Sequence, residues 1–408
     1  MAKSKTKNSK TLGVALIGSK FMGKAHSNAY LNVSKFFDLP LDPRMVIAAA
    51  RDPKDLAAFS KRWGWERSTT DWRQAIADPE VDLVDVSTPN HLHAEQSIAA
   101  LEAGKHVACE KPLAGTLDEA RSMVEAAKKA RKQQTFVWFN YRRVPAIAFA
   151  RQLVQEGRLG QIYHVRCVYK QDWGGPETPL LWRFRGKDAG SGALGDLGAH
   201  IIDAARFITD DEIAEITGAI LETFVKERAI VEETAAKAAS LKGNKKKRKT
   251  KPNMGRSTVD DAAVFTARFK QGAIATFEAT RLSTGDKNGN RIEIHGEHGA
   301  IRFGFNRMNE LEWYDNTLEP RLQGWSTIDV TDGDAGHPYV ANWWPVGHGL
   351  GYEHGFINQL ADTCRVIAGK KISAPIPDFK DAYQTQRVME AVVLSARNHA
   401  TIKLSEVK

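Results

Sequence analysis

The sequence predicts an α/β protein in which a doubly wound parallel sheet is followed by a C-terminal α+β domain with a mainly antiparallel, open sheet. Strand and helix patterns alternate over the first 140 or so residues, whereas short strands separated by turns dominate from about residue 141 onward. Strict alternation requires parallel strands joined by right-handed crossovers. Strand patterns joined by short turns indicate antiparallel pairing instead.

The first domain is expected at residues 11–140. An apolar run at residues 12–17 leads into a glycine turn and a helix start, which begins the alternation. Further strands are expected at residues 45–50, 81–87, 106–109 and 135–139, and further helices at residues 54–63, 94–103 and 117–130. Gly104 directly follows the helix at residues 94–103, a position at which glycine commonly ends a helix.

The second domain is expected at residues 141–408. A helix at residues 145–156 precedes a strand at residues 162–169, and a second helix is expected at residues 195–207. Strands follow at residues 214–223, 259–269, 273–280, 291–294 and 300–305. A low-complexity insertion at about residues 226–258 is rich in alanine and lysine, and only residues 231–241 have a pattern compatible with a helix. The remainder has too little apolar content to form a core.

Composition is that of an ordinary soluble globular protein. Of the 408 residues, 42% are hydrophobic and 26% are charged, and no apolar run approaches the roughly 20 residues of a membrane span. No apolar segment of the signal-peptide type precedes the first strand. The three cysteines, Cys109, Cys167 and Cys364, are odd in number and far apart, which favours free thiols in a reducing cytoplasm over a disulfide framework.

The net charge of +9 raises the question of nucleic-acid binding. Residues 1–10 contain four lysines, and residues 242–251 contain seven further cations, without an acidic residue in either stretch. Without these eleven charges the rest of the chain carries about −2. We therefore expect a flexible basic N-terminus and a solvated basic insertion, and neither a nucleic acid nor a membrane as partner.

The glycine turn at residues 18–23 has the form of a dinucleotide-binding, Rossmann-type turn. Gly18 and Gly23 stand where a Cβ would obstruct the approach of helix N-terminal N–H groups to a pyrophosphate. Lys20 occupies the position of the middle glycine of the usual G-x-G-x-x-G pattern. The pattern is therefore incomplete, and the prediction of a nucleotide site depends on the segments that follow.

Two later segments supply groups that the oxidation of a hydroxyl needs. Lys111 follows an apolar strand end, and Asp196, His200 and Asp203 recur at spacings of four and seven residues. On one helix these three side chains would lie within about 40° of one another. A lysine can hold the hydroxyl oxygen, a histidine can accept its proton, and a carboxylate can orient the acceptor. Asp196 is also compatible with an ordinary helix cap.

Together these segments resemble the Gfo/Idh/MocA oxidoreductase family (glucose–fructose oxidoreductase and inositol dehydrogenase), and the resemblance runs over nearly the whole chain. Its landmarks stand in the family's order: the turn at residues 18–23, Ser87-Thr88-Pro89-Asn90 with His93, Glu110-Lys111-Pro112, Asn140-Tyr141-Arg142-Arg143, and residues 195–200. Residues 21–27 and 337–354 are most similar to the branch that includes levoglucosan dehydrogenase.

The resemblance implies NAD or NADP as cofactor and assigns the site residues. The catalytic residues are Lys111, Asp196 and His200. The cofactor is expected to contact Gly18, Ser19, Lys20, Phe21, Met22, Gly23, Arg51, Asp52, Ser87, Thr88, Pro89, Asn90, His93, Glu110, Lys111 and Asn140. The substrate is expected to contact Lys111, Tyr141, Arg142, Trp173, Asp196 and His200.

The cofactor's phosphate specificity depends on the end of the second strand. An acidic residue commonly stands there in NAD-preferring proteins and binds the ribose hydroxyls. Here Ala50 is followed by Arg51 and Asp52. Arg51 suits a 2′-phosphate and Asp52 suits the ribose, so tolerance of NADP is expected and the preference stays open.

The predicted reaction moves a hydride between the nicotinamide and a secondary hydroxyl or ketone of a sugar, glycoside or cyclitol. Trp173, Trp182, Trp343 and Trp344 are candidates to cover the apolar face of such a ring. His295 and His298 lack further ligands at metal-site spacing, so no metal is expected. Two alternatives stay open, a glycoside-processing enzyme that oxidises the sugar transiently with a tightly bound cofactor, and a non-catalytic sensor. By resemblance we expect a cytoplasmic homodimer or homotetramer.

Overall fold

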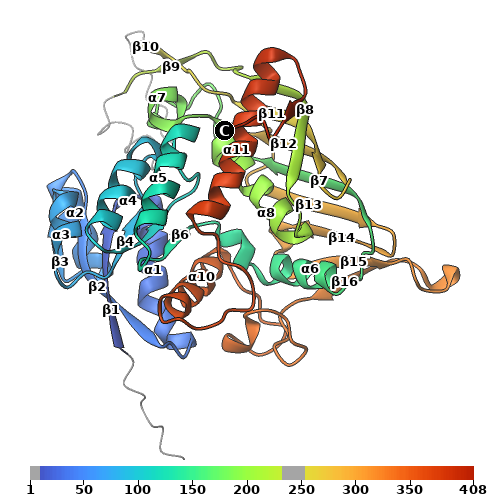
Figure 1. The fold of residues 1–408 in the computed structure, drawn as a ribbon, viewed down its shortest axis with the longest axis horizontal. Helices are drawn as coiled ribbons and strands as arrows, with labels where there is room; N and C mark the ends of the chain where they lie inside the picture. The colour runs from blue at the N-terminus through green and yellow to red at the C-terminus, as the bar shows by residue number, and fades with distance from the viewer. Residues whose placement is uncertain (1–9, 232–252) are drawn as a thin grey trace, which may run out of the picture.

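The computed structural model describes residues 10–231 and 253–408, which form two β-sheets with helices packed against and between them (Figure 1). The N-terminal sheet has six parallel strands in the order β3-β2-β1-β4-β5-β6, and the C-terminal sheet has nine strands in the order β16-β15-β14-β13-β7-β12-β11-β8-β17. The predicted fold class is confirmed.

The N-terminal sheet is a doubly wound unit, and its helices alternate with its strands as expected. Its strands are β1 (Lys10–Ile17), β2 (Leu41–Ala49), β3 (Arg67–Thr69), β4 (Leu83–Val86), β5 (His106–Cys109) and β6 (Thr135–Val137), and its helices are α1 (Phe21–Phe36), α2 (Pro53–Trp63), α3 (Trp72–Ala77), α4 (His93–Glu102) and α5 (Leu117–Lys129). The strand order reverses between β1 and β4. A crevice for ligands is therefore expected beyond the carboxyl ends of these two strands.

The C-terminal sheet is mixed. β12 pairs with β7 in parallel, whereas every other pair of neighbouring strands described in this sheet is antiparallel. Its strands are β7 (Ile162–Lys170), β8 (Ile213–Glu222), β11 (Ala262–Phe269), β12 (Ile274–Thr280), β13 (Gly289–Gly296), β14 (Gly299–Gly304), β15 (Glu310–Asp315), β16 (Trp325–Asp329) and β17 (Ile402–Lys403). β11 alternates strictly between buried and exposed side chains, so one face is packed and the other is open.

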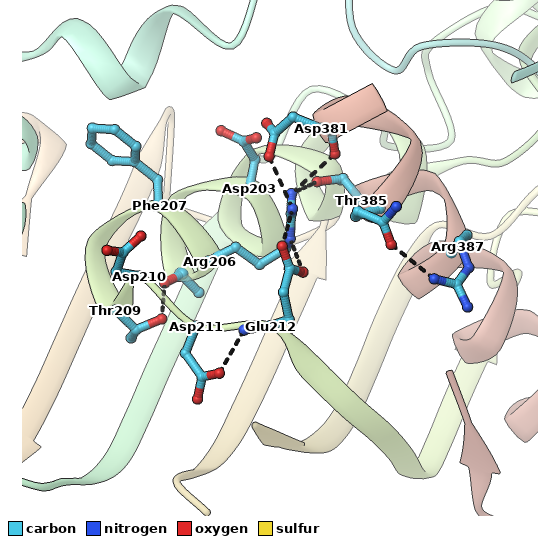
Figure 2. A network of polar contacts seen from close by, with 12 residues as sticks. Asp203, Arg206, Phe207, Thr209, Asp210, Asp211, Glu212, Asp381, Thr385 and Arg387 are labelled. Atoms are coloured by element: carbon cyan, nitrogen blue, oxygen red, sulfur yellow. Dashed lines mark hydrogen bonds and ion pairs between the residues drawn. The ribbon is translucent and has the colours of Figure 1, made fainter. Parts of the chain in front are cut away.

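Helices α6 (Pro145–Gln155), α8 (Ala199–Thr209) and α11 (Phe379–Asn398) pack on this sheet, and α7 (Gly186–Ala189) is a single turn beside the cavity described below. Figure 1 shows α11 between the two sheets, where it contacts α5 on one side and β8 on the other. Helix α11 was not predicted from the sequence. Arg206 of α8 forms an ion pair with Asp381 of α11 at 3.0 Å and donates a hydrogen bond to Thr385 of α11 at 2.9 Å. It also pairs with Glu212, which directly precedes β8, at 2.7 Å (Figure 2).

The expected insertion is only partly within the described residues. β9 (Glu227–Ala229) and β10 (Met254–Arg256) form a separate two-stranded antiparallel sheet. The expected helix at residues 231–241 and the basic N-terminus lie almost wholly outside the described residues. Among residues 10–231 and 253–408, no helix combines the length and apolar character that crossing a bilayer requires.

Helix α10 (Tyr352–Ile367) lies near the C-terminal end of the chain but belongs to the core of the N-terminal sheet. It packs against α1, and its buried Phe356, Leu360 and Cys364 share one apolar cluster with Leu12 and Val14 of β1. Residues after 141 therefore complete the core of the first sheet.

Candidate active site

A cavity of about 700 Å³ opens where β1, β4 and β5 end, and residues that follow these strands line it together with residues of the C-terminal sheet. Side chains from both sheets line it. They are Lys20, Phe21, Met22, Ser87, Thr88, Pro89, Asn90, Glu110, Lys111, Pro112, Asn140, Tyr141, Tyr169, Gln171, Trp173, Leu181, Trp182, Arg183, Ala189, Ser191, Asp196, Leu197, His200, Arg281, Asn288, Phe305, Tyr352 and Phe356. Most of the residues predicted from the sequence are thus brought to one place.

The turn between β1 and α1 forms one wall of the cavity. Gly18 has φ +119°, and a Cβ there would lie 2.6 Å from the carbonyl oxygen of Ser87, so only glycine fits. Helix α1 begins without a side-chain cap and without an acidic residue in its first turn. Its first N–H groups and the positive end of its dipole are therefore available to an anion. The turn fits the pyrophosphate of a dinucleotide.

The loop after β4 forms the next part of the wall. Ser87 Oγ donates to the carbonyl oxygen of Ile17 at 3.1 Å, and Asn90 Nδ2 donates to that of Ala189 at 2.9 Å. His93 differs from the prediction. It is fully buried, and its ring nitrogens lie 3.0 Å from the carbonyl oxygens of Pro112 and Thr88. It therefore supports the loop and is not among the residues that line the cavity.

Arg51 and Asp52 lie at the end of β2, outside the residues that line the cavity. Asp52 caps α2, because its carboxylate accepts from the backbone N–H of Asp55 at 3.0 Å. Arg51 is exposed. Both stand beyond the strand that follows the glycine turn, where a ribose is bound in doubly wound sheets, so the choice between them stays a prediction.

Lys111 and Asp196 form an ion pair in the centre of the cavity. Lys111 Nζ donates to the backbone oxygen of Asp196 at 2.8 Å and to its Oδ1 at 3.2 Å, while Arg281 Nη2 donates to its Oδ2 at 3.1 Å. Burial alone would raise the pKa of Asp196, but Lys111, Arg281 and Arg183 outweigh it and hold the pKa well below its usual value. The carboxylate is ionised at every physiological pH.

His200 lies on the same cavity as this ion pair and is 8% exposed. Its ring stacks on Tyr141 with 4.5 Å between centroids, and its Nδ1 has no hydrogen-bond partner in the described part of the chain. Burial, and then the charge of Lys111, lower the pKa of His200 well below its usual value, against the opposing effect of Asp196. The imidazole is therefore neutral at neutral pH and keeps an acceptor nitrogen.

The expected alignment of Asp196, His200 and Asp203 on one helix face is only partly realised. Residues Leu194–Gly198 form a π-helical turn before α8 begins at Ala199, and Asp203 points away from the cavity. Its carboxylate accepts from Arg142 Nε at 2.8 Å. Arg142 is buried, also pairs with Asp381, and is absent from the cavity lining. The assignment of Arg142 to the substrate is therefore corrected, since its charge is used between helices.

A chain of polar side chains continues along the cavity wall from Tyr141. Its hydroxyl is 2.8 Å from that of Tyr169, which donates to Asn288 Oδ1 at 2.9 Å. Gln171 Nε2 donates to the same Oδ1 at 2.7 Å, and Gln171 Oε1 accepts from Trp173 Nε1 at 2.6 Å. Tyr169, Gln171 and Asn288 were missed in the sequence, where they carry no motif. The alternation of the strand that ends near Lys170 was the one available signal.

The predicted tryptophans separate into two groups. Trp173 and Trp182 line the cavity. Trp343 and Trp344 instead contact Phe36 of α1, with ring centroids 4.3 Å and 5.2 Å away, and are not among the residues that line the cavity. Arg183 is a further cavity residue that the sequence analysis missed. Its guanidinium lies over the Trp182 ring at 4.5 Å.

A crevice that fits a dinucleotide and opens onto a lysine, an ionised carboxylate and a neutral imidazole is the arrangement of a nicotinamide-dependent dehydrogenase or reductase, and the fold and site assign the chain to this class. Comparison with known families gives the finer placement. The chain belongs to the Gfo/Idh/MocA oxidoreductase family: residues 12–139 match the NAD-binding Rossmann-fold model of the oxidoreductase family, and residues 147–302 match the GFO/IDH/MocA C-terminal domain.

Three relatives cover almost the whole chain. A levoglucosan dehydrogenase from Pseudarthrobacter phenanthrenivorans is 40% identical over 400 residues, 97% of this chain and 99% of the relative. The structure of an oxidoreductase domain protein from Kribbella flavida is 49% identical, with a TM-score of 0.88 over 97% of this chain and 99% of that one. A levoglucosan dehydrogenase in complex with NADH and levoglucosan is 38% identical, with a TM-score of 0.87 over 97% and 100%. The predicted family, enzyme class and NAD-type cofactor are confirmed.

Proposed function

We propose that this chain oxidises a secondary hydroxyl of a compact polyhydroxylated ring (a sugar, glycoside or cyclitol) or reduces the corresponding ketone. The observation that carries the proposal is the meeting of Lys111, Asp196 and His200 on one cavity, beside a wall of hydroxyl and amide groups. Relatives named for levoglucosan oxidation, 38–40% identical over 97% of the chain, support the substrate class.

Lys111 is the group proposed to bind the reacting oxygen. An ammonium has three donors, and Asp196 accepts two of them. The third is available to a substrate hydroxyl or ketone oxygen. Asp196 keeps Lys111 oriented, and Arg281 keeps Asp196 ionised. A positive charge beside the oxygen stabilises the alkoxide that develops as the hydroxyl is oxidised.

His200 is proposed to accept the hydroxyl proton. Because its pKa is lowered well below the usual value, the imidazole has a free acceptor nitrogen throughout the neutral range. The bound nicotinamide supplies hydride acceptance. In the direction of ketone reduction the same residues act in reverse, and the proton returns to the new hydroxyl oxygen.

The remaining lining favours a ring with many hydroxyls. Trp173 and Trp182 present indole faces that can cover the apolar side of a pyranose. Gln171, Asn288 and Tyr169 present donors and acceptors at neighbouring positions. A substrate screen tests this: levoglucosan, glucose, methyl glucoside and myo-inositol with NAD, followed by the absorbance of NADH. Turnover is expected on at least one of them and on neither lactate nor malate. Faster oxidation of a hydroxy acid would overturn the substrate class.

The screen also separates the two alternatives. An enzyme that oxidises the sugar only transiently would purify with a nicotinamide absorbance and show no net formation of NADH. A non-catalytic sensor would bind the ring without changing the absorbance. Net NADH formation contradicts both.

A homodimer or homotetramer in the cytoplasm is part of the proposal. Exposed Ile220, Val264 and Ile274 on the open face of the C-terminal sheet support self-association, and three free, buried cysteines suit a reducing compartment. Light scattering of the purified protein measures the oligomer, and a monomer at micromolar concentration would contradict it.

A further inference from the structure

His26 lies in the first turns of α1, fully buried, with a carboxylate on each side of its ring. Its Nδ1 is 3.0 Å from Asp85 Oδ2, and its Nε2 is 3.0 Å from Glu110 Oε1. The ring also packs on Trp138, with centroids 4.3 Å apart. Three buried ionisable side chains from α1, β4 and the end of β5 thus form one unit, which the proposed reaction does not otherwise use.

The two contacts decide the protonation of the ring. An ionised carboxylate only accepts hydrogen bonds, so both ring nitrogens of His26 must carry protons for both bonds to form. Burial alone would lower the pKa of His26, but Asp85 and Glu110 outweigh burial and raise it to about 9. The unit is therefore an imidazolium between two carboxylates at neutral pH.

The two carboxylates are held differently. Asp85 also accepts from the hydroxyl of Tyr30 at 2.8 Å and from Trp138 Nε1 at 3.0 Å. Within the described residues, Glu110 has one other donor, the backbone N–H of Lys111 at 3.2 Å. Loss of His26 would leave Asp85 with two strong donors and Glu110 with a single long hydrogen bond. Its effect therefore falls on Glu110.

Glu110 connects this unit to the cavity. It lines the cavity beside Lys111, and its backbone N–H donates to the carbonyl oxygen of Val86 at 2.8 Å. The sheet thus fixes the main chain of Glu110. The position of its side chain, in contrast, depends mainly on the hydrogen bond to His26.

We propose that His26 is a positioning residue that, as an imidazolium, keeps the Glu110 carboxylate ionised and fixed in the cavity floor next to Lys111. The inference rests on the role of Lys111 in the proposed function. A fixed negative charge in the cavity favours the positively charged oxidised nicotinamide over the neutral reduced form. His26 thereby affects both the geometry of Lys111 and the relative affinity for the two cofactor forms.

The neighbours of Glu110 whose pKa values are shifted by burial move away from the range between about pH 7 and pH 9. The cations Lys111 and Arg183 lie on its cavity side. Burial lowers the pKa of His93 below its usual value. Burial raises the pKa values of Cys109 and Tyr352 well above their usual values and raises the pKa of Tyr141 to about 12. A change in activity over this range in a His26 variant is therefore assignable to Glu110.

The test compares His26→Gln, Glu110→Gln and the double variant, with Tyr30→Phe as the matched control, because Tyr30 touches Asp85 and not Glu110. His26→Gln is expected to lower kcat about tenfold near pH 7, because a buried carboxyl without a cation beside it favours its neutral form, and to recover towards wild type near pH 9 as Glu110 ionises again. Glu110→Gln is expected to lose activity equally at every pH, and the double variant should equal it. Tyr30→Phe should keep the wild-type profile.

A binding measurement gives a second readout that needs no turnover. Fluorescence titration near pH 7 is expected to show weaker NAD binding in His26→Gln with little change for NADH. A pH-independent loss in His26→Gln, or losses that add in the double variant, would overturn the proposal and leave His26 a packing residue.

If His26→Gln does not fold, ¹⁵N-histidine NMR of the wild-type protein tests the same point. Both ring nitrogens of His26 should show the imidazolium shift near pH 7.5, assigned by the signal that moves in Glu110→Gln. A neutral tautomer would overturn the inference. Because this experiment involves no substrate, its failure is distinguishable from failure of the proposed function.

Discussion

The cluster that joins α8 to α11 and the cluster around Lys111 in the cavity both pair cationic side chains with carboxylates, but they differ in how many hydrogen-bonding groups stay without a partner. In the first, every nitrogen of Arg206 donates to an oxygen of Glu212, Asp381 or Thr385 (Figure 2). In the second, Lys111 keeps a donor beyond those that Asp196 accepts, and His200 keeps a ring nitrogen without a partner among the described residues. Closed networks hold helices together, whereas incomplete ones can bind a substrate.

The largest effect that this comparison predicts is on stability. Asp203→Ala leaves the buried Arg142 with only Asp381, which it shares with Arg206, and the free energy of unfolding should fall by about 3 kcal/mol, the lower end of the range for a broken buried ion pair. Urea denaturation measures it. Asp210→Asn is the control, because Asp210 pairs with Arg151 while 58% exposed, and exposed pairs contribute about 0–1 kcal/mol. An Asp203 variant of normal stability that has lost turnover would return Arg142 and Asp203 to the active site.

Lys111→Met should lower kcat by about 100-fold or more, as expected for the loss of a group that shares a proton in the transition state. The denaturation midpoint and the affinity for NAD should change little. Lys187→Met, at an exposed lysine outside the cavity, should behave as wild type. Near-normal kcat in the Lys111 variant would sink its catalytic assignment.

The lowered pKa of His200 is expected to determine the shape of the pH–rate profile. A proton acceptor must be neutral, and the pKa of His200 lies well below its usual 6.5, so the rate should be flat through neutrality and fall only in acid. His200→Ala should lower the rate and abolish that acid limb. A profile that keeps the same limb in the variant would assign it to another group.

Arg51 and Asp52, at the edge of the site, are expected to set the cofactor preference. Arg51→Ala should weaken NADP binding about tenfold, the size expected for a charge-assisted contact, and leave NAD unchanged. Titration of both cofactors measures it. A wild-type preference for NAD above about 100-fold, or about 2.7 kcal/mol, would mean that Asp52 controls the pocket.

The smallest effect concerns the basic segments. Deleting residues 1–10 and replacing residues 242–251 by a short glycine–serine linker should leave kcat within a few-fold, because neither sequence carries apolar periodicity or a site motif. Activity and light scattering of the variant check this. Loss of the oligomer would show that the insertion has a structural role.

Local patterns predicted much of this molecule, because the glycine turn, the lysine at a strand end and the spacing of Asp196 and His200 are each contained in a short segment. Arg142 was misplaced for a related reason. It follows Asn140 and Tyr141 in a 3₁₀ turn (Asn140–Arg143), where adjacent residues point in different directions, and the sequence does not reveal which of them faces the cavity.

Contacts between distant segments could not be predicted. His26 meets Asp85 and Glu110 across 59 and 84 residues, and Tyr169 meets Asn288 across 119. Each side chain is unremarkable in its own segment, and only the pairing of strands brings it to its partner. The expected boundary between the two domains near residue 140 stays a prediction.

Helix α10 has a consequence for synthesis on the ribosome. The chain emerges from its N-terminus, yet the cluster around Leu12 and Val14 is closed by Phe356 and Leu360, and the cavity is lined in part by Tyr352 and Phe356. Synthesis proceeds at roughly 5–20 residues per second. The apolar face of the first sheet is therefore uncovered for tens of seconds before α10 is made. A nascent chain of this protein is therefore exposed to aggregation until almost all of it has been made, and chaperone binding to the N-terminal sheet should persist that long.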